Sequence, residues 1–235
     1  MPCVETPERY ITVPKHHSQQ SEGELAQRHA SALLAKNPAE LEAAYDGWAT
    51  KYDDDVAAIS GLGLNQWGQS AVKTLQQHCS PTNFPRLLDF GCGTGHIGPL
   101  LHELGWRTVL HGCDLSHGML QIAQTRGCYT KLMKSTFGSS GAEPGYYHVI
   151  HSVAVFAPGQ APPQIFDEFI RLLQPGGLAI FTVRTGYYDG PEGAAHKEYL
   201  EDLCRRRKWD LISQTEEDYL PKENIMCYVF CIKIL

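Results

Sequence analysis

The spacing of apolar positions predicts helices in the first third of the chain. Ser21 and Glu24 have the spacing of a capping box, and an apolar stripe at helical spacing follows them. Asn37 and Pro38 are suited to end this helix and to begin the next, as N-cap and first helical residue. One face of the second helix carries Leu41, Tyr45, Trp48, Tyr52 and Val56. A third helical pattern covers residues 65–79.

From residue 86 onward, apolar runs alternate with helical patterns. The runs that predict strands are 86–90, 108–113, 129–134, 147–153 and 178–183. The helical patterns between or after them are 95–104, 117–126, 162–173 and 191–207. This alternation predicts a mostly parallel sheet with helices on both faces. The C-terminal segment contains two strand-like runs around Pro221 with no helix between them, so we expect the last two strands to be antiparallel neighbours.

The length of 235 residues fits one α/β domain with an N-terminal addition. We predict a flexible tail over residues 1–20, a lid of N-terminal helices over 21–80 and a cofactor-binding domain over 81–235. The net charge of −6 at pH 7 disfavours a nucleic-acid partner, because such proteins usually present a broad basic face.

The cysteines and the hydropathy pattern indicate the compartment. Eight cysteines are scattered without a C-x-x-C pair or a zinc-ligand spacing, which favours reduced thiols and predicts no metal site. The first 20 residues lack the apolar core of a signal peptide, and no run approaches the roughly 18 apolar residues needed to cross a membrane. We therefore expect a soluble, cytoplasmic protein with no membrane partner.

The stretch LLDFGCGTGHIG, residues 87–98, places a glycine-rich turn between an apolar strand and a helical pattern. From Gly93 it contains G-x-G-x-x-G, which is typical of dinucleotide-binding turns. From Asp89 it contains D-x-G-x-G-x-G, a different nucleotide-binding pattern. In both interpretations the free backbone N–H groups at the turn are expected to point outward to a polar or anionic ligand.

Two acidic residues bear on the choice of cofactor. Asp114 ends the next predicted strand, 19 residues after Gly95, where a carboxylate accepts both ribose hydroxyls of an adenosine. NAD and S-adenosylmethionine (SAM) both contain that ribose, so Asp114 does not separate them. Asp89 is badly placed against a pyrophosphate, whereas it suits a cofactor with an ammonium and a sulfonium group. The turn therefore favours SAM.

Several motifs resemble those of class I SAM-dependent methyltransferases. Residues 87–95 resemble the first motif of that family, residues 114–123 the second, and Pro175-Gly176-Gly177 the usual entry to the fifth strand. The resemblance covers about residues 41–235. It implies an α/β fold with a Rossmann-like sheet, mostly parallel with the last strand antiparallel, and an N-terminal helical lid.

A closer resemblance is to the methyltransferase-like proteins named for the Williams–Beuren syndrome chromosomal region. The residues that carry it are Tyr45-Asp46-x-Trp48-Ala49-x-x-Tyr52-Asp53, Gly127-x-Tyr129, Val155-Phe156, Pro162-Pro163-x-x-Phe166-x-Glu168 and Phe181-Thr182-x-Arg184.

The family resemblance implies which residues bind the methionine and ribose parts of SAM. Gly91, Cys92 and Gly93 are expected to contact the methionine part through backbone atoms. Asp89 is expected to lie close to its amine, and Asp114 to bind the ribose.

Other residues are expected around the adenine and the sulfonium. Leu115 and Met119 suit the two flat apolar faces of the adenine, although Met119 also suits plain core packing. Thr136 stands where many relatives have an acid that accepts the adenine amino group, and its hydroxyl is a weaker substitute. Tyr52 and Tyr45 are expected to contact the cofactor from the lid, where an aromatic face also suits the sulfonium.

The acceptor pocket is expected beyond the carboxyl ends of the fourth and fifth strands. Arg184, Tyr187 and Tyr188 follow the fifth strand, and Arg184 suits a carboxylate on the substrate. Trp48 lines this pocket in one interpretation and packs on the core in the other. His151 is the candidate catalytic base by position, and a buried structural histidine is the alternative.

We therefore predict a SAM-dependent methyltransferase that methylates a small-molecule acceptor by direct in-line displacement and releases S-adenosylhomocysteine. Three alternatives remain open. The G-x-G-x-x-G pattern also fits an NAD-linked oxidoreductase. A SAM-binding regulatory protein without methyl transfer and a protein or RNA methyltransferase are the other two.

Overall fold

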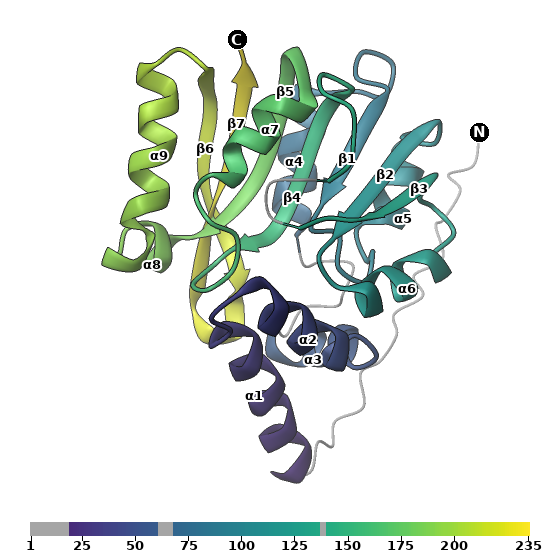
Figure 1. Cartoon of the computed structure of the whole chain (residues 1–235), viewed down its shortest axis with the longest axis vertical. Coiled ribbons are helices and arrows are strands. Elements are labelled where there is room, and N and C mark those ends of the chain that lie inside the picture. The colour runs from purple at the N-terminus through teal and green to yellow at the C-terminus, as the bar shows by residue number, and fades with distance from the viewer. Residues whose placement is uncertain (1–18, 61–67, 137–139) are drawn as a thin grey trace, which may run out of the picture.

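The computed structural model describes residues 19–60, 68–136 and 140–235. Within these residues a seven-stranded sheet has the order β3-β2-β1-β4-β5-β7-β6 (Figure 1). The strands are β1 (Arg86–Phe90), β2 (Val109–Asp114), β3 (Lys131–Lys134), β4 (Tyr147–Phe156), β5 (Leu173–Arg184), β6 (Trp209–Leu220) and β7 (Ile225–Ile234). The pairs among β1 to β5 are parallel, and β7 is antiparallel to both β5 and β6. The predicted Rossmann-like sheet with an inserted antiparallel last strand is confirmed.

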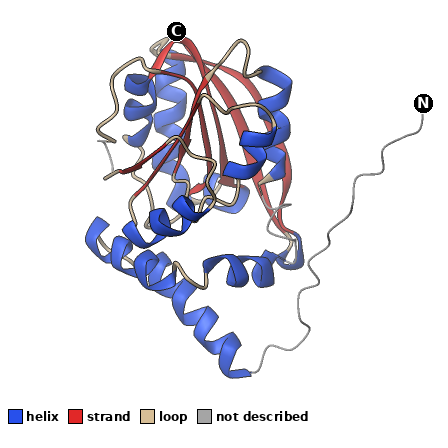
Figure 2. Cartoon of the chain, turned by 90° about the vertical axis from the view of Figure 1, so that its right-hand side faces the viewer, coloured by secondary structure: helices blue, strands red, loops and turns tan. Residues whose placement is uncertain are grey.

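Helices cover both faces of the sheet (Figure 2). They are α1 (Gln19–Leu33), α2 (Pro38–Trp48), α3 (Tyr52–Ser60), α4 (Gln69–His78), α5 (Gly98–Glu103), α6 (His117–Thr125), α7 (Ile165–Leu172), α8 (Thr185–Tyr188) and α9 (Ala194–Arg205), with short 3-10 helices η1 (Pro191–Gly193) and η2 (Pro221–Glu223). Helices α4 and α5 belong to the apolar cluster on one face, and α7 and α9 to the cluster on the other. Helices α1, α2 and α3 gather beyond the end of the sheet at which β4 and β5 terminate (Figure 1).

Two details of the N-terminal helices differ from the sequence prediction. Helix α1 begins at Gln19, so Ser21 lies inside the helix and does not cap it. The single helix expected after Pro38 is divided into α2 and α3 by a turn at residues 49–51. Three acidic residues, 53–55, stand in the first turn of α3, where negative charge favours a helix N-terminus. The predicted N-cap is confirmed, because the Asn37 side chain accepts a hydrogen bond from the Glu40 N–H at 2.9 Å.

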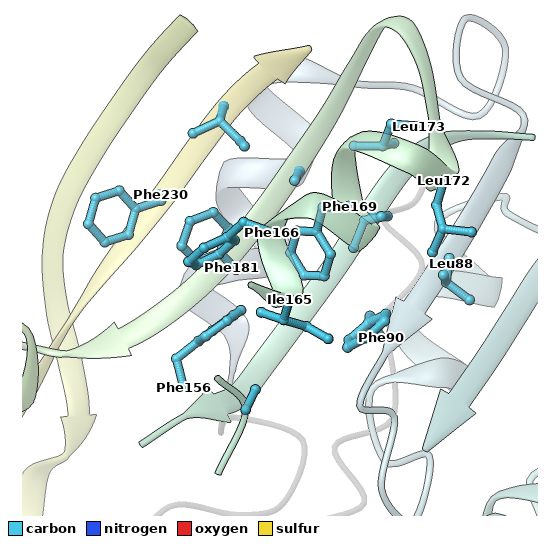
Figure 3. Packing of buried hydrophobic residues seen from close by; sticks show 14 of the residues in the cluster. Leu88, Phe90, Phe156, Ile165, Phe166, Phe169, Leu172, Leu173, Phe181 and Phe230 are labelled. Atoms are coloured by element: carbon cyan, nitrogen blue, oxygen red, sulfur yellow. The ribbon is translucent and has the colours of Figure 1, made fainter. Parts of the chain in front are cut away.

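Alternating residues of the central strands supply the two apolar clusters. In β1, Leu88 and Phe90 face the α7 side, whereas Leu87 faces the α4 side. On the α7 side, aromatic rings from β4, β5, β7 and α7 pack together around Phe166 and Phe181, whose centroids are 5.3 Å apart (Figure 3). This packing fixes the carboxyl ends of β1, β4 and β5, where the candidate site lies.

The tail predicted over residues 1–20 falls almost wholly outside the described residues, as do residues 65–67 at the start of the third predicted helix. Among the helices in the described part of the chain, none has the length and hydrophobicity that a bilayer-spanning helix requires. The seven cysteines in that part are all free thiols.

Candidate functional site

The glycine turn follows β1, and at Gly91 its backbone leaves no room for a side chain. Gly91 has a φ of +69°, in the left-handed region that glycine adopts without strain. A Cβ atom on Gly91 would lie 2.2 Å from Cγ2 of Val155, near the end of β4. The absent side chain therefore lets the turn approach the end of β4 closely.

The N–H groups of the turn do not point outward, contrary to expectation. Gly91 and Cys92 both donate to the Cys113 carbonyl, at 2.8 and 2.9 Å, and Gly95 donates to the Cys92 carbonyl at 2.8 Å. The N–H of Gly93 donates to Oδ2 of Asp114 at 2.9 Å. A pyrophosphate site needs such groups free to bind phosphate oxygens. Since these four are already engaged, the turn is poorly suited to a dinucleotide.

Asp114 is held at the end of β2 by two backbone donors. Besides the Gly93 bond, its Oδ1 accepts the N–H of Ser116 at 2.9 Å. Burial raises the pKa of Asp114 to about 6, although the hydrogen bonds from Ser116 and Gly93 act to lower it. Both carboxylate oxygens have further lone pairs, so this group is fixed and able to accept hydroxyl donors.

A cavity of about 740 Å³ opens in front of Asp114. It brings together eight of the ten predicted cofactor-binding residues: Tyr45, Tyr52, Gly91, Cys92, Gly93, Asp114, Leu115 and Met119. These residues come from α2, α3, the glycine turn and the start of α6, which are far apart in sequence. The walls are mainly apolar with one carboxylate, a composition that suits an adenosine-containing ligand.

The other two predicted residues do not line this cavity. Asp89 is buried beneath the turn, where its Oδ2 accepts the hydroxyl hydrogen of Tyr129 at 2.6 Å. Burial and the charge of Asp89 raise the pKa of Tyr129 well above its usual value, so the phenol remains a donor. Thr136 is exposed, and its neighbour Ser135 lines the cavity in its place.

His151 lies inside the sheet, away from the candidate site. Its side chain has no solvent exposure, and Nδ1 is 3.6 Å from Oδ1 of Asp89. It lines neither the first cavity nor the second one described below. Both ring nitrogens are buried without a hydrogen-bond partner among the described residues, and the role of His151 as a catalytic base stays a prediction.

Acidic side chains of α2 and α3 fasten these helices over the first cavity; Glu42, Asp46 and Asp53 are called the acidic clamp below. Asp46 accepts hydrogen bonds from the Ser116 hydroxyl and, at 2.8 Å, from the N–H of Gly118.

The two other members of the acidic clamp form ion pairs. Asp53 pairs with Arg126 and accepts the Thr94 hydroxyl, which lies in the glycine turn. Glu42 pairs with Lys134 at the end of β3. These contacts give α2 and α3 a fixed position against the glycine turn, α6 and the end of β3.

Replacing Asp46 with alanine is expected to lower the free energy of unfolding by about 1 kcal/mol, because two donors at the start of α6 lose their acceptor. It is also expected to weaken S-adenosylhomocysteine binding severalfold, since α2 lines the cavity. Thermal unfolding and calorimetric titration measure the two effects. The matched control is Asp54→Ala on the exposed side of α3, for which both values should stay near those of the wild type. Equal behaviour of the two variants would contradict the clamp.

A second cavity, of about 670 Å³, adjoins the first and shares Tyr45, Tyr52, Ala154 and Gln160 with it. Of the four residues predicted for the acceptor pocket, Trp48 and Arg184 line this second cavity. Tyr187 and Tyr188 do not. The Tyr187 hydroxyl lies 3.0 Å from Nδ1 of His196, and Tyr188 is buried against β7.

Trp48 is a buried residue that also lies on the wall of the second cavity. Its Nε1 donates to Oδ2 of Asp55 at 2.7 Å. The ring also packs between Tyr45 and Tyr52, at centroid distances of 6.1 and 4.9 Å. The aromatic stripe of the N-terminal helices is therefore part of the wall between the two cavities.

Ala154 lies in this wall with an unusual backbone. It has a φ of +64°, and the pairing of β4 with β5 is irregular between Ser152 and Phe156. The N–H of Ala154 donates to Oγ1 of Thr182 at 3.0 Å, which holds the irregular segment in place. Left-handed non-glycine residues and strand bulges are both concentrated at functional sites.

Sequence reasoning missed several residues of the first cavity. Gln160 accepts the Tyr45 hydroxyl at 3.1 Å, from a loop after β4 that no motif marks. His96 follows the last glycine of the turn, and burial lowers its pKa to about 4, so it is neutral at pH 7. Its position next to Gly95 was the one feature of the sequence that could have indicated that His96 lines the cavity.

The pKa of Asp114 predicts a pH dependence of cofactor binding. Ribose hydroxyls donate to the ionised carboxylate, so their binding stabilises that form and lowers the pKa of Asp114 in the complex. The affinity is therefore complete above a pH of about 6 and is lost as the pH falls through that value. We expect S-adenosylhomocysteine to bind roughly tenfold more weakly at pH 5 than at pH 7 by calorimetry. Asp114→Asn should remove this dependence of the affinity on pH. An unchanged pH dependence in the variant would show that Asp114 is not its cause.

Comparison with known proteins identifies the family. The family model described as "Methyltransferase domain" matches residues 25–216, which is most of the chain. This range includes every lining residue of the first cavity and all but Tyr219 and Leu220 of the second. Methyltransferase-like protein 27 of Homo sapiens is 34% identical over 165 residues, covering 69% of this chain and 63% of the human protein. A putative methyltransferase of Geobacillus sp. is 27% identical over 150 residues, covering 61% of this chain and 58% of that protein. The matched regions thus span less than two thirds of either relative.

The fold agrees with this assignment. A SAM-dependent methyltransferase of Aquifex aeolicus superposes with a TM-score of 0.60 at 15% identity, covering 81% of this chain and 98% of the other. The first cavity combines a fixed carboxylate, mainly apolar walls and a glycine-rich turn. The chain therefore belongs to the methyltransferase-domain family, and its fold is the one seen in that SAM-dependent methyltransferase.

Proposed function

We propose that this protein is an enzyme that transfers a methyl group from SAM to a small molecule bound in the second cavity. The observation that carries the proposal is the wall shared by the two cavities, formed by Tyr45, Tyr52, Ala154 and Gln160. Methyl transfer needs a cofactor site and an acceptor site that meet at one point.

The first cavity supports a specific placement of SAM. Asp114 accepts the ribose hydroxyls, and Leu115 and Met119 flank the adenine. The turn from Gly91 to Gly93 lets its backbone approach the methionine part. SAM, when bound, supplies a methyl group that is already activated as a sulfonium. The wall residues Tyr45 and Tyr52 then face that group.

The chain itself has two tasks in this reaction: to align the acceptor with the methyl group and to exclude water. The three N-terminal helices contribute to the walls of the second cavity, so they exclude solvent from it. Ala154, with its small side chain, lines both cavities and leaves the shared wall thin. Alignment of this kind accounts for a large part of such a rate enhancement without a covalent intermediate.

A small acceptor is favoured over a protein or an RNA. The second cavity lies under α1, α2 and α3, which leaves no open face for a large partner on that side. The net charge of −6 is also unfavourable for RNA. The closer grouping with the Williams–Beuren methyltransferase-like proteins remains a proposal, as do the lid boundaries of residues 21–80 and a cytoplasmic location.

The experiment has two stages. Calorimetric titration with S-adenosylhomocysteine is expected to show one site per chain, and absence of binding would refute the cofactor site. Incubation with radiolabelled SAM and separate small-metabolite, protein and RNA fractions is then expected to label the metabolites. Label in protein or RNA would refute the small-molecule acceptor, and binding without any labelling would favour a regulatory SAM-binding protein.

A further inference from the structure

The second cavity has the lining of a site for an apolar molecule. Trp48, Val56, Ile59, Phe156 and Leu220 provide most of its apolar walls. Its described lining contains no aspartate or glutamate. An acceptor here is therefore expected to have a hydrocarbon or aromatic body.

Arg184 is the permanent charge on this lining within the described residues. It ends β5, and its side chain reaches the cavity, with the guanidinium carbon 5.4 Å from the centre of the Tyr219 ring. The guanidinium also hydrogen-bonds to Tyr219, which leaves most of its five donors for other partners.

No ion pair among the described residues involves Arg184, whereas half-buried Arg28, Arg126 and Arg171 are paired with carboxylates. Half-buried Arg86 has no carboxylate partner either, and its side chain donates to Gln174 instead. A half-buried cation without a carboxylate loses part of its hydration and gains no ion pair in return. A bound anion supplies that missing interaction.

We propose that the methyl acceptor is a small apolar monocarboxylate, and that Arg184 binds its carboxylate in the second cavity. This rests on the proposed function, because it names the class of molecule that the second cavity receives. A carboxylate matches the planar fork of the guanidinium with two parallel hydrogen bonds. A phosphate dianion fits less well, since one cation on an otherwise apolar wall neutralises a single charge.

Arg184 acts here as a positioning residue for the acceptor. It stands at the carboxyl end of β5, next to β4, whose bulge at Ala154 forms part of the shared wall. Fixing the carboxylate at this point directs the rest of the molecule along the apolar lining. The same charge also disfavours cationic molecules.

The test uses the full chain saturated with S-adenosylhomocysteine and three probes: 3-phenylpropionate, its uncharged amide and phenyl phosphate. Calorimetry or ligand-observed NMR measures their binding. Wild-type protein is expected to bind the carboxylate at least tenfold more tightly than either other probe. Arg184→Gln should remove the preference over the amide, and Arg184→Lys should keep part of it. Arg205→Gln, on the exposed end of α9, is the matched control and should behave as wild type.

Measuring S-adenosylhomocysteine binding to Arg184→Gln and to wild-type protein distinguishes a failure of this inference from a failure of the proposed function. Unchanged binding is expected, because Arg184 does not line the first cavity. A loss of binding in this variant would place Arg184 in the cofactor site and overturn the inference. Equal binding of carboxylate and amide to wild-type protein, tighter binding of the phosphate, or no binding of the carboxylate would also overturn it. Failure of wild-type protein to bind S-adenosylhomocysteine would instead refute the proposed function.

Discussion

Asp114→Ala is expected to weaken S-adenosylhomocysteine binding about 100-fold. The ribose hydroxyls lose a charged acceptor, and hydrogen bonds to charged groups contribute about 1.5–3 kcal/mol each. The turn also loses the bond from the Gly93 N–H to Oδ2, so its backbone is less firmly held beside the cavity. Calorimetric titration at pH 7.5, where the carboxylate is ionised, measures the change.

Two further variants make this result interpretable. Asp114→Asn keeps the size of the side chain and one acceptor oxygen, so an intermediate loss of affinity is expected. Asp210→Ala removes an exposed carboxylate from β6 and should leave binding unchanged. Asp114→Ala that folds normally and binds with wild-type affinity would show that the ribose does not use Asp114.

Gly98→Ala is expected to destabilise the protein by about 2–3 kcal/mol and to lower the Tm by about 4–12 °C. Gly98 is the first residue of α5, and a Cβ atom there would lie 2.6 Å from the hydroxyl and Cζ of Tyr129 and 2.7 Å from Sγ of Cys128. The Tyr129 ring is held by its bond to buried Asp89, so moving it costs a second interaction.

The matched control for this prediction is Gly47→Ala. Gly47 lies within α2, and a Cβ atom there has no atom within 4 Å. Its replacement is expected to stabilise the protein by up to about 1 kcal/mol, because alanine is the better helix former. Thermal unfolding of the two variants should therefore shift in opposite directions. A Gly98→Ala protein as stable as wild type would mean that Tyr129 moves without cost.

Gly98 also explains why the turn fits two patterns. Gly98 completes the G-x-G-x-x-G pattern, but glycine is needed there because α5 packs closely against Tyr129. This contact is unrelated to phosphate binding. The pattern D-x-G-x-G-x-G was informative for a different reason than expected. Asp89 does not face the cavity but anchors Tyr129 beneath the turn, so its carboxylate organises the site from below.

Periodicity predicted the sheet well, because β1, β4, β5 and β7 contain long buried apolar runs, and the helices between the strands follow from the same pattern. It missed the division between α2 and α3, since the apolar spacing from Tyr45 to Tyr52 continues through the turn at 49–51. The spacing of apolar residues is the same whether the helix continues or the chain changes direction at a turn. The acids at 53–55 were the signal for a new helix start.

The cofactor cavity was more predictable than the acceptor cavity for a physical reason. The cofactor side is built from turns directly after β1 and β2, so sequence position fixes spatial position. At β3 an offset of one residue was enough to select exposed Thr136 over Ser135. Tyr187 and Tyr188 lie in a short helix, α8, that turns away from the end of β5. Because this helix has only four residues, the sequence pattern is too short to predict the direction in which it runs.

The acidic clamp has a kinetic consequence. Cofactor and product pass a boundary held by carboxylates of α2 and α3, of which Glu42 and Asp53 face Lys134 and Arg126. Opening this boundary separates opposite charges near the surface, and dissolved ions screen such charges over about 8–10 Å at ordinary salt concentrations. Under the proposed function, the rate at which spent cofactor is exchanged for fresh cofactor is therefore expected to depend on ionic strength, whereas the transfer step within the cavities is not. Slow exchange in dilute buffer and faster exchange in salt would follow from two ion pairs, Glu42 with Lys134 and Asp53 with Arg126, that lie outside both cavities.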